Sequence, residues 1–295
     1  MTAARFVSTT AWLPLGWMAV FLLLPVAILL RVSLSEPRFD QPPYTELFAI
    51  DETGHWVWEG SLQAWRWLFE DPTYRDALLG SLVMASLTTI ACLLLSLPMA
   101  WAIARAPLAW RTALLLAVIL PFWTSFLIRV YAWISLLKPE GLINTTLLGT
   151  GIIDTPLLIL HTNAAVLIGM TYAYLPFMVL PLYATFVRIE DDLLQAAADL
   201  GATPWQTFLR ISLPLAWPGV LAGCLLVFIP AMGDFVVPDL LGGPDNYMLG
   251  TALWNEFFRN ADWPTASALA LTMLLVLLAP LALLQRLQRR DEVPA

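Results

Sequence analysis

The chain is poor in the residues that carry most protein chemistry. Among its 295 residues only two are cysteine and two are histidine. Cys92 and Cys224 lie in long apolar segments, where we interpret them as small packing residues. The Cys/His spacing of a metal site is absent, so the sequence predicts no bound metal. It also shows no nucleophile placed beside a base. We therefore expect a non-catalytic chain.

Lysine is almost absent as well. The single lysine, Lys138, is followed by Pro139, and the sequence contains no G-x-x-x-x-G-K-[ST]. That motif cradles phosphates with its glycine-rich backbone and its lysine. The chain is therefore expected to hydrolyse no ATP by itself and to bind no cofactor.

Charge is sparse, and this is the feature that sets the fold class. Charged residues make up 13% of the chain, against about 25% in soluble domains, and the mean hydropathy is +0.74. The charge-free segments have the length of helices, and about 20 apolar residues suffice to cross a bilayer. The first segment is too long for a cleaved signal peptide. We predict an all-α integral membrane protein, one domain over residues 1–295, with six spans at about 11–31, 77–104, 112–136, 162–187, 213–236 and 263–285.

The distribution of charge predicts the orientation. With both termini in the cytoplasm, eight of the fifteen Lys and Arg residues lie inside, as the positive-inside rule requires. The outer segments, of which 32–76 is the longest, together with the outer ends of the spans carry sixteen of the 22 acids against seven basic residues, a net charge of −9. The inner segments come to eight minus six, or +2. Such an outer surface is either ordinary loop solvation or a vestibule that attracts cations.

Residues 188–214, here called the elbow, connect the fourth and fifth predicted spans on the cytoplasmic side. Acids at Glu190-Asp191-Asp192 suit a helix N-terminus, and the Ala- and Leu-rich segment 193–200 suits its body. Gly201 can end that helix with a positive φ. Thr203-Pro204 can begin a second short helix, with the threonine as its cap. We interpret this helix–turn–helix as a surface that docks onto a partner.

The elbow also carries a spaced motif. Gln195-Ala196-Ala197 is followed four residues later by Gly201, and Ile211 comes ten residues after that, leading into Leu213-Pro214. This resembles the EAA signature of ABC importer membrane subunits. One letter differs, because Gln195 stands where the family usually has glutamate. The exchange removes a charge and keeps the size of the side chain.

Further segments resemble the permease subunits of putrescine/spermidine ABC importers, and the putrescine type most closely. The likeness extends from about residue 12 to about residue 285. The segments that carry it are Leu120–Trp133, Phe228–Pro238, Leu240–Pro244, Leu253–Phe258 and Asp262–Pro264.

This resemblance implies a type I importer with the MetI-like permease fold in the bacterial inner membrane. The implied partners are a second related permease, two ATP-binding subunits that hold ATP and Mg, and a periplasmic polyamine-binding protein; no nucleic acid is expected. The first helix of the elbow would be the coupling helix. The residues expected to couple to the ATPase are Gln195, Ala196, Ala197, Asp199, Gly201, Ile211, Leu213 and Pro214.

A polyamine crossing the membrane needs carboxylates for its ammonium groups and aromatic walls for its aliphatic stem. Asp234, in the outer half of the fifth span, is the first candidate acid, and a structural ion pair with Arg129 is its alternative role. We expect Arg129 to be paired or to reach the outer surface. The other candidates for the path are Asp239, Glu256, Trp123, Tyr131, Trp133, Tyr172 and Tyr174, each of which could instead serve packing, interface anchoring or loop solvation.

Two other functions remain open at this point. One is an ABC permease for another small solute, although the outer negative charge disfavours an anion. The other is a stand-alone secondary transporter, which would need no docking elbow and should show inverted repeats. We expect the binding protein to set most of the selectivity between putrescine and spermidine.

Overall fold

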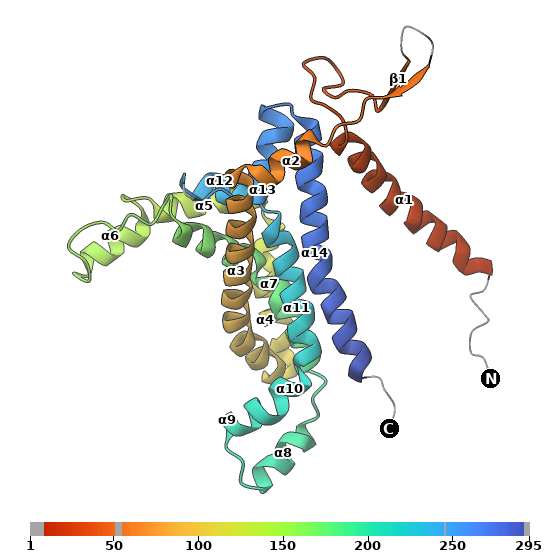
Figure 1. The fold of residues 1–295 in the computed structure, drawn as a ribbon. Helices are drawn as coiled ribbons and strands as arrows, with labels where there is room; N and C mark the ends of the chain where they lie inside the picture. The colour runs from red at the N-terminus through yellow and green to blue at the C-terminus, as the bar shows by residue number, and fades with distance from the viewer. Residues whose placement is uncertain (1–8, 51–54, 245, 292–295) are drawn as a thin grey trace. The chain divides into compact units, whose positions relative to one another are not determined.

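The computed structural model describes residues 9–50, 55–244 and 246–291 of a mostly helical chain (Figure 1). The chain packs as two compact units. One holds the residues up to Arg75 together with Ala252–Leu278, and the other holds Asp76–Thr251 together with the segment from Ala279 onward. The single domain expected over residues 1–295 stays a prediction.

In chain order the elements are α1 Thr9–Ser33, β1 Phe48–Ile50, β2 Trp56–Trp58, α2 Gln63–Glu70, α3 Pro72–Arg105, α4 Leu108–Ile119, η1 Leu120–Trp123, α5 Phe126–Leu137, α6 Leu142–Gly149, α7 Asn163–Phe186, α8 Asp191–Asp199, α9 Pro204–Thr207, η2 Phe208–Ser212, α10 Leu213–Leu215, α11 Trp217–Met232, α12 Val236–Leu241, α13 Leu249–Trp254, η3 Asn255–Arg259 and α14 Trp263–Asp291.

Three helices among the described residues, within α1, α3 and α7, are each long and apolar enough to cross a membrane. Two bent helix pairs raise that number to five if each pair is one span. The apolar part of α14, Trp263–Ala279, is a shorter helix. Helical spans are therefore confirmed, and the count of six stays a prediction.

The third predicted span, 112–136, is broken. The segments Leu108–Trp123 and Phe126–Gly149 meet at an angle of 91°. Between them Thr124 and Ser125 have extended backbones, and the Thr124 hydroxyl donates to the Pro121 carbonyl at 2.7 Å. A proline lacks the N–H that would continue the helix, so the break follows the η1 turn. A single continuous helix over 112–136 is thus replaced by α4 and η1 followed by α5.

The fifth predicted span, 213–236, begins later than the sequence suggested. Leu213–Leu215 forms the short helix α10 at the end of the elbow, and the chain then bends by 68° into α11. The Ala216 N–H still bonds to the Ser212 carbonyl at 2.9 Å, so the bend keeps its backbone hydrogen bond. α11 ends at Met232, and Asp234 lies in the turn between it and α12.

Helices α7 and α11 pack against each other in the second unit. Phe186, Met178 and Leu182 of α7 are fully buried, as is Val227 of α11. Small residues let the two backbones approach: a Cβ at Gly219 would lie 2.8 Å from the carbonyl oxygen of Pro181. Lipid tails are as apolar as the side chains, so the hydrophobic effect does not drive helices together in a membrane. Membrane helices instead gain packing contacts where glycine lets their backbones come close.

The long segment 32–76 of the first unit contains local structure. Strands β1 and β2 pair antiparallel, with Phe48 opposite Trp58 and their rings edge to face at 5.1 Å. The Asp71 carboxylate accepts from the Thr73 N–H at 2.8 Å at the start of α3. Hydrogen bonds from Thr73 hold the pKa of Asp71 below its ordinary value, as expected for an anion at a helix N-terminus.

Candidate functional site

The elbow is a structured surface. Its first helix, α8, begins with Asp191 and Asp192 in the first turn, where carboxylates suit the partial positive charge of the helix end. The second helix, α9, follows after a short turn, and both lie beyond the ends of α7 and α11 (Figure 1). The helix–turn–helix predicted for residues 188–214 is therefore present.

Gly201 ends α8 as the sequence predicts. Its φ is +82°, a left-handed conformation that costs other L-residues about 1–2 kcal/mol. Its N–H bonds to the Ala198 carbonyl at 2.8 Å, and the Ala202 N–H bonds to Ala197 at 3.0 Å. These bonds satisfy carbonyls that the helix end leaves free. An added Cβ would meet nothing within 4 Å, so backbone conformation alone selects glycine here.

The start of α9 is a complete capping box. The Gln206 N–H donates to the Thr203 hydroxyl at 3.3 Å, and the Thr203 N–H donates to the Gln206 side-chain oxygen at 2.9 Å. Pro204 occupies the first turn, where its missing N–H costs nothing. The cap predicted at Thr203 is confirmed. Gln206, which completes it, is a partner that sequence analysis missed, although threonine followed by glutamine three residues later is its pattern.

Most of the residues expected to couple to an ATPase lie on the elbow surface. Gln195, Ala196 and Asp199 of α8 are exposed, whereas Ala197 is buried and faces the protein. Gly201 and Pro214 are exposed, and Ile211 and Leu213 are half-buried. The elbow therefore presents part of the motif outward and uses the rest for its own packing.

Two large apolar side chains of the elbow were not singled out in the sequence. Leu200 is 90% exposed and Trp205 is 67% exposed, one on each side of the Gly201 turn. Trp205 stacks on Phe208 at 5.9 Å, which leaves its outer edge free. Tryptophan is among the residues most enriched at the energetic centres of protein interfaces, so Trp205 is the stronger candidate anchor of the two.

Replacing Gly201 by valine should distort this surface, because a β-branched residue is strained at positive φ. We expect the elbow to lose about 1–2 kcal/mol of local stability and the chain to retain less ATPase on purification. Asparagine tolerates the left-handed region, so Gly201→Asn is the matched control. Equal ATPase recovery from Gly201→Val, Gly201→Asn and the wild type would contradict this role.

Asp234 is buried, and its carboxylate forms hydrogen bonds with other residues of the second unit. Its Oδ1 accepts from the N–H groups of Val236 at 2.9 Å and Val237 at 3.3 Å, and its Oδ2 accepts from the Tyr174 hydroxyl at 3.0 Å. The residue is 7% exposed. These three donors hold the Asp234 carboxyl group in one orientation. The alternative ion pair with Arg129 is not formed.

Arg129 is held by aromatic rings instead. Its guanidinium carbon lies 4.7 Å from the centre of the Phe122 ring and 5.6 Å from that of Phe126. Its Nε and Nη1 are buried without a hydrogen-bond partner among the described residues. The structure shows no ion pair of Arg129 with an acid among the described residues, and the expectation that Arg129 is either paired or reaches the outer surface stays a prediction. Cation–π contacts with η1 and α5 take the place of a counter-ion.

The candidate aromatic residues fall into separate groups. Tyr174 contacts Asp234, whereas Trp133 and Tyr172 pack edge to face at 5.4 Å. Trp123 and Tyr131 are largely exposed, and so is Asp239. The structure thus brings together one acid and one tyrosine of the predicted path within this unit.

Glu256 belongs to the first unit and is 9% exposed. Its two oxygens accept from the Tyr74 hydroxyl and from the Asn260 side-chain amide, each at 2.9 Å. It lines a cavity of about 850 Å³ together with Pro37–Pro43 and Asn260–Trp263. The described residues contain no cluster of three or more His, Cys, Asp or Glu that could hold a metal ion.

A family model described as "Binding-protein-dependent transport system inner membrane component" matches residues 74–291. The match begins two residues into α3, extends to the end of α14 and includes the elbow. The spermidine/putrescine transport system permease protein PotB of Escherichia coli (strain K12) is 41% identical over 262 residues, which cover 89% of this chain and 90% of that protein. The PotB protein of Haemophilus influenzae is 38% identical over 276 residues, covering 93% and 92%.

Among solved structures, a bacterial ABC transporter involved in the import of the acidic polysaccharide alginate matches with a TM-score of 0.70. The match covers 97% of this chain and 96% of that one, at 19% identity, and it supports the fold. With the family model and the relatives, it shows the MetI-like permease fold. The chain belongs to the family of binding-protein-dependent transport system inner membrane components, the non-catalytic permease subunits of ABC transporters.

Proposed function

We propose that this chain is the membrane-spanning permease subunit of an ATP-driven importer that moves polyamines from the periplasm to the cytoplasm. Putrescine is the first candidate substrate and spermidine the second. The observation that carries the proposal is the identity of 41% to the Escherichia coli spermidine/putrescine permease over 89% of this chain. Identity at that level over nearly the whole length includes the spans as well as the elbow.

The charge distribution supports a cationic substrate. The predicted outer segments and the outer ends of the spans together carry sixteen acids and seven basic residues, a net charge of −9. A surface of one sign raises the local concentration of the opposite ion and speeds its arrival. In this proposal Asp234 meets an ammonium group inside the membrane, and Glu256 and Asp239 act nearer the outer mouth. Tyr174 holds the Asp234 carboxylate in place by its hydrogen bond at 3.0 Å.

The proposed assembly contains four kinds of chain. Two ATP-binding subunits hold ATP and Mg, a second related permease completes the pathway, and a periplasmic binding protein delivers the polyamine. The elbow supports the contact with the ATPase, because Leu200 and Trp205 expose apolar surface beside a well-capped turn. The proposed orientation, with both termini in the cytoplasm, places this surface on the side where ATP is available.

Uptake of labelled putrescine tests the proposal. A strain without other polyamine uptake systems would carry this chain intact or deleted, and unlabelled spermidine would be the competitor. We expect uptake to fall to background on deletion, to return on re-expression, and to be reduced by spermidine. Unchanged uptake after deletion would mean that the permease serves another small solute.

Co-purification of an ATPase separates this proposal from a stand-alone secondary transporter. An ABC permease should retain its ATP-binding subunit through the elbow, and uptake should stop when that subunit cannot hydrolyse ATP. Uptake that continues at full rate with the ATPase disabled would overturn the ATP-driven mechanism.

A further inference from the structure

The backbone connects the coupling helix α8 to the membrane helices only at the two ends of α8. α7 leads into it through residues 187–190, and Gly201 leads out of it toward α11. α3 ends at Arg105, 86 residues before Asp191 in the sequence, so no short backbone link joins α3 to α8. Any movement of α8 that is to reach α3 must pass through side chains.

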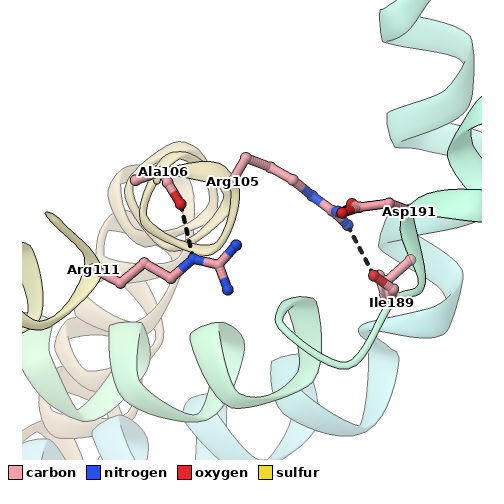
Figure 2. Close-up of polar contacts among 5 residues, drawn as sticks. All are labelled: Arg105, Ala106, Arg111, Ile189 and Asp191. Carbon is pink, nitrogen blue, oxygen red and sulfur yellow. Dashed lines mark hydrogen bonds and ion pairs between the residues drawn. The ribbon is translucent and has the colours of Figure 1, made fainter. Parts of the chain in front are cut away.

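Arg105 supplies such a contact (Figure 2). It lies in the last turn of α3, and its Nη1 forms an ion pair with the Asp191 carboxylate in the first turn of α8. Its Nη2 donates to the Ile189 carbonyl at 3.4 Å. The cation stands at a helix C-terminus and the anion at a helix N-terminus, so both helix dipoles favour this arrangement.

The arginine is held more firmly than the acid. The Arg105 side chain is 23% exposed, and its guanidinium carbon lies 4.6 Å from the centre of the Trp101 ring. The Asp191 side chain is 74% exposed. A guanidinium fixed by a ring on one face can present its N–H groups in one direction with little loss of entropy. The ring of Trp101 therefore holds the Arg105 side chain in place, and the contacts of Arg105 connect the start of α8 to α3.

Trp101 extends the same contact to the rest of the elbow. Its ring packs edge to face on Phe186, the last residue of α7, at 5.3 Å, and on Phe208 of η2 at 5.4 Å. Phe186 is fully buried. The end of α3 thus touches the chain both before and after α8.

We propose that Arg105 is a positioning residue that ties the coupling helix to α3, so that displacement of α8 by the ATPase moves α3 together with α7 and α11. We call the contact of Arg105 with Asp191 and the Ile189 carbonyl the latch. Without it, α8 can shift while α3 lags behind, and ATP is hydrolysed with less substrate moved. This inference rests on the proposed ATP-driven import and adds a residue outside the EAA-like motif to its coupling.

A double-mutant cycle in the complete transporter tests the latch. The variants are Arg105→Gln, Asp191→Asn and the two combined, reconstituted in vesicles with the partner permease, ATPase and binding protein. We expect each single variant to lower the amount of putrescine imported per ATP hydrolysed about two- to five-fold. This is the fold-change that corresponds to the free energy of an exposed ion pair. The combined variant should be no worse than either single one, because both remove the same contact.

The neighbouring residues offer matched controls. Arg111 lies in the first turn of α4, six residues after Arg105, but its Nε donates to the Ala106 carbonyl at 2.8 Å (Figure 2). Asp192 is exposed beside Asp191, outside the contact with Arg105. Arg111→Gln and Asp192→Asn should therefore keep the wild-type ratio. Arg105→Lys should recover part of it, since lysine keeps the charge without the planar fork.

Cleavage by trypsin after Arg188, an exposed residue beside the latch, gives a readout that needs no substrate. In the assembled complex in inside-out vesicles, Arg105→Gln and Asp191→Asn should speed cleavage there, and Arg111→Gln should not. Faster cleavage in a complex that imports no polyamine would overturn the proposed substrate and keep the latch. Equal ratios and equal cleavage for the Arg105 and Arg111 variants, or fully additive losses in the combined variant, would overturn the latch.

Discussion

Asp234→Asn should lower putrescine uptake at least about ten-fold, which corresponds to about 1.4 kcal/mol, while the amount of assembled permease stays near the wild-type level. The substitution removes a charge and keeps the shape of the side chain. A carboxylate and an ammonium ion attract each other by about 4 kcal/mol at 4 Å with an effective dielectric constant of about 20, and desolvation offsets part of this gain. Initial rates of labelled putrescine uptake, normalised to permease in the membrane, measure the effect.

The hydrogen bonds explain why the Asp234→Asn substitution should preserve the fold. Oδ1 of Asp234 accepts from the N–H groups of Val236 and Val237 at 2.9 and 3.3 Å, and the carbonyl oxygen of an asparagine amide can accept from both in the same way. The amide nitrogen would donate to the Tyr174 oxygen, because a phenol can turn its O–H away and accept. Asp234→Ala would instead leave these two buried N–H groups without an acceptor, at about 1–3 kcal/mol each.

Three further variants separate charge from structure. Asp234→Ala should reduce the amount of folded permease, and Tyr174→Phe should weaken uptake less than Asp234→Asn because the carboxylate keeps its two backbone donors. Asp154→Asn removes an exposed charge that lies outside the proposed path and should have a small effect. Wild-type uptake by Asp234→Asn would remove Asp234 from the substrate path and leave it the structural role of fixing the start of α12.

The parts of the elbow that the sequence predicted are those set by local chemistry. Gly201 adopts a positive φ, and Thr203 caps the helix that begins at Pro204, because each outcome depends on residues within three or four positions. The family could likewise be inferred from a motif contained in one segment. Interactions over such short distances leave a readable pattern in the amino-acid order.

The features that were missed depend on residues far apart in the chain. Asp234 bonds to Tyr174 across 60 positions, and Arg105 pairs with Asp191 across 86. In the alternative role considered for Asp234, its partner was Arg129. Charge alone favours that pair, but the rings of Phe122 and Phe126 hold the guanidinium elsewhere. No pattern in a single sequence reports which of these competing contacts is closer.

The break in the third span shows a different limit. Pro121 lies inside an apolar run, and a proline there is compatible with a mild kink as well as with an end of the helix. The structure has a full break, because Thr124 and Ser125 leave the helical region and α5 starts in a new direction. Hydropathy counts both segments as one span, since it records composition and not direction.

Gly219→Leu should nearly abolish the assembled permease. Gly219 lies on α11 against α7, where an added Cβ would overlap the Thr185 side chain and stand 2.8 Å from the Pro181 carbonyl oxygen. A backbone carbonyl cannot turn away as a side chain can. Extra atoms in a packed core cost about 1–3 kcal/mol, and leucine adds three carbons beyond the Cβ. Permease extracted in mild detergent, measured by its amount and its thermal unfolding, reports the loss.

Gly16→Leu is the matched control, because Gly16 also lies within a long apolar helix but has nothing within 4 Å of an added Cβ. Leucine is a better helix former than glycine, so this variant should be at least as stable as the wild type. Gly219→Ala should fall between the two, since its single methyl group meets the same carbonyl with less volume. If Gly219→Leu assembled as well as Gly16→Leu, α7 and α11 would have to separate without cost. The interface between α7 and α11 would then not be rigid. A displacement of the elbow could in that case move one of the two helices without the other.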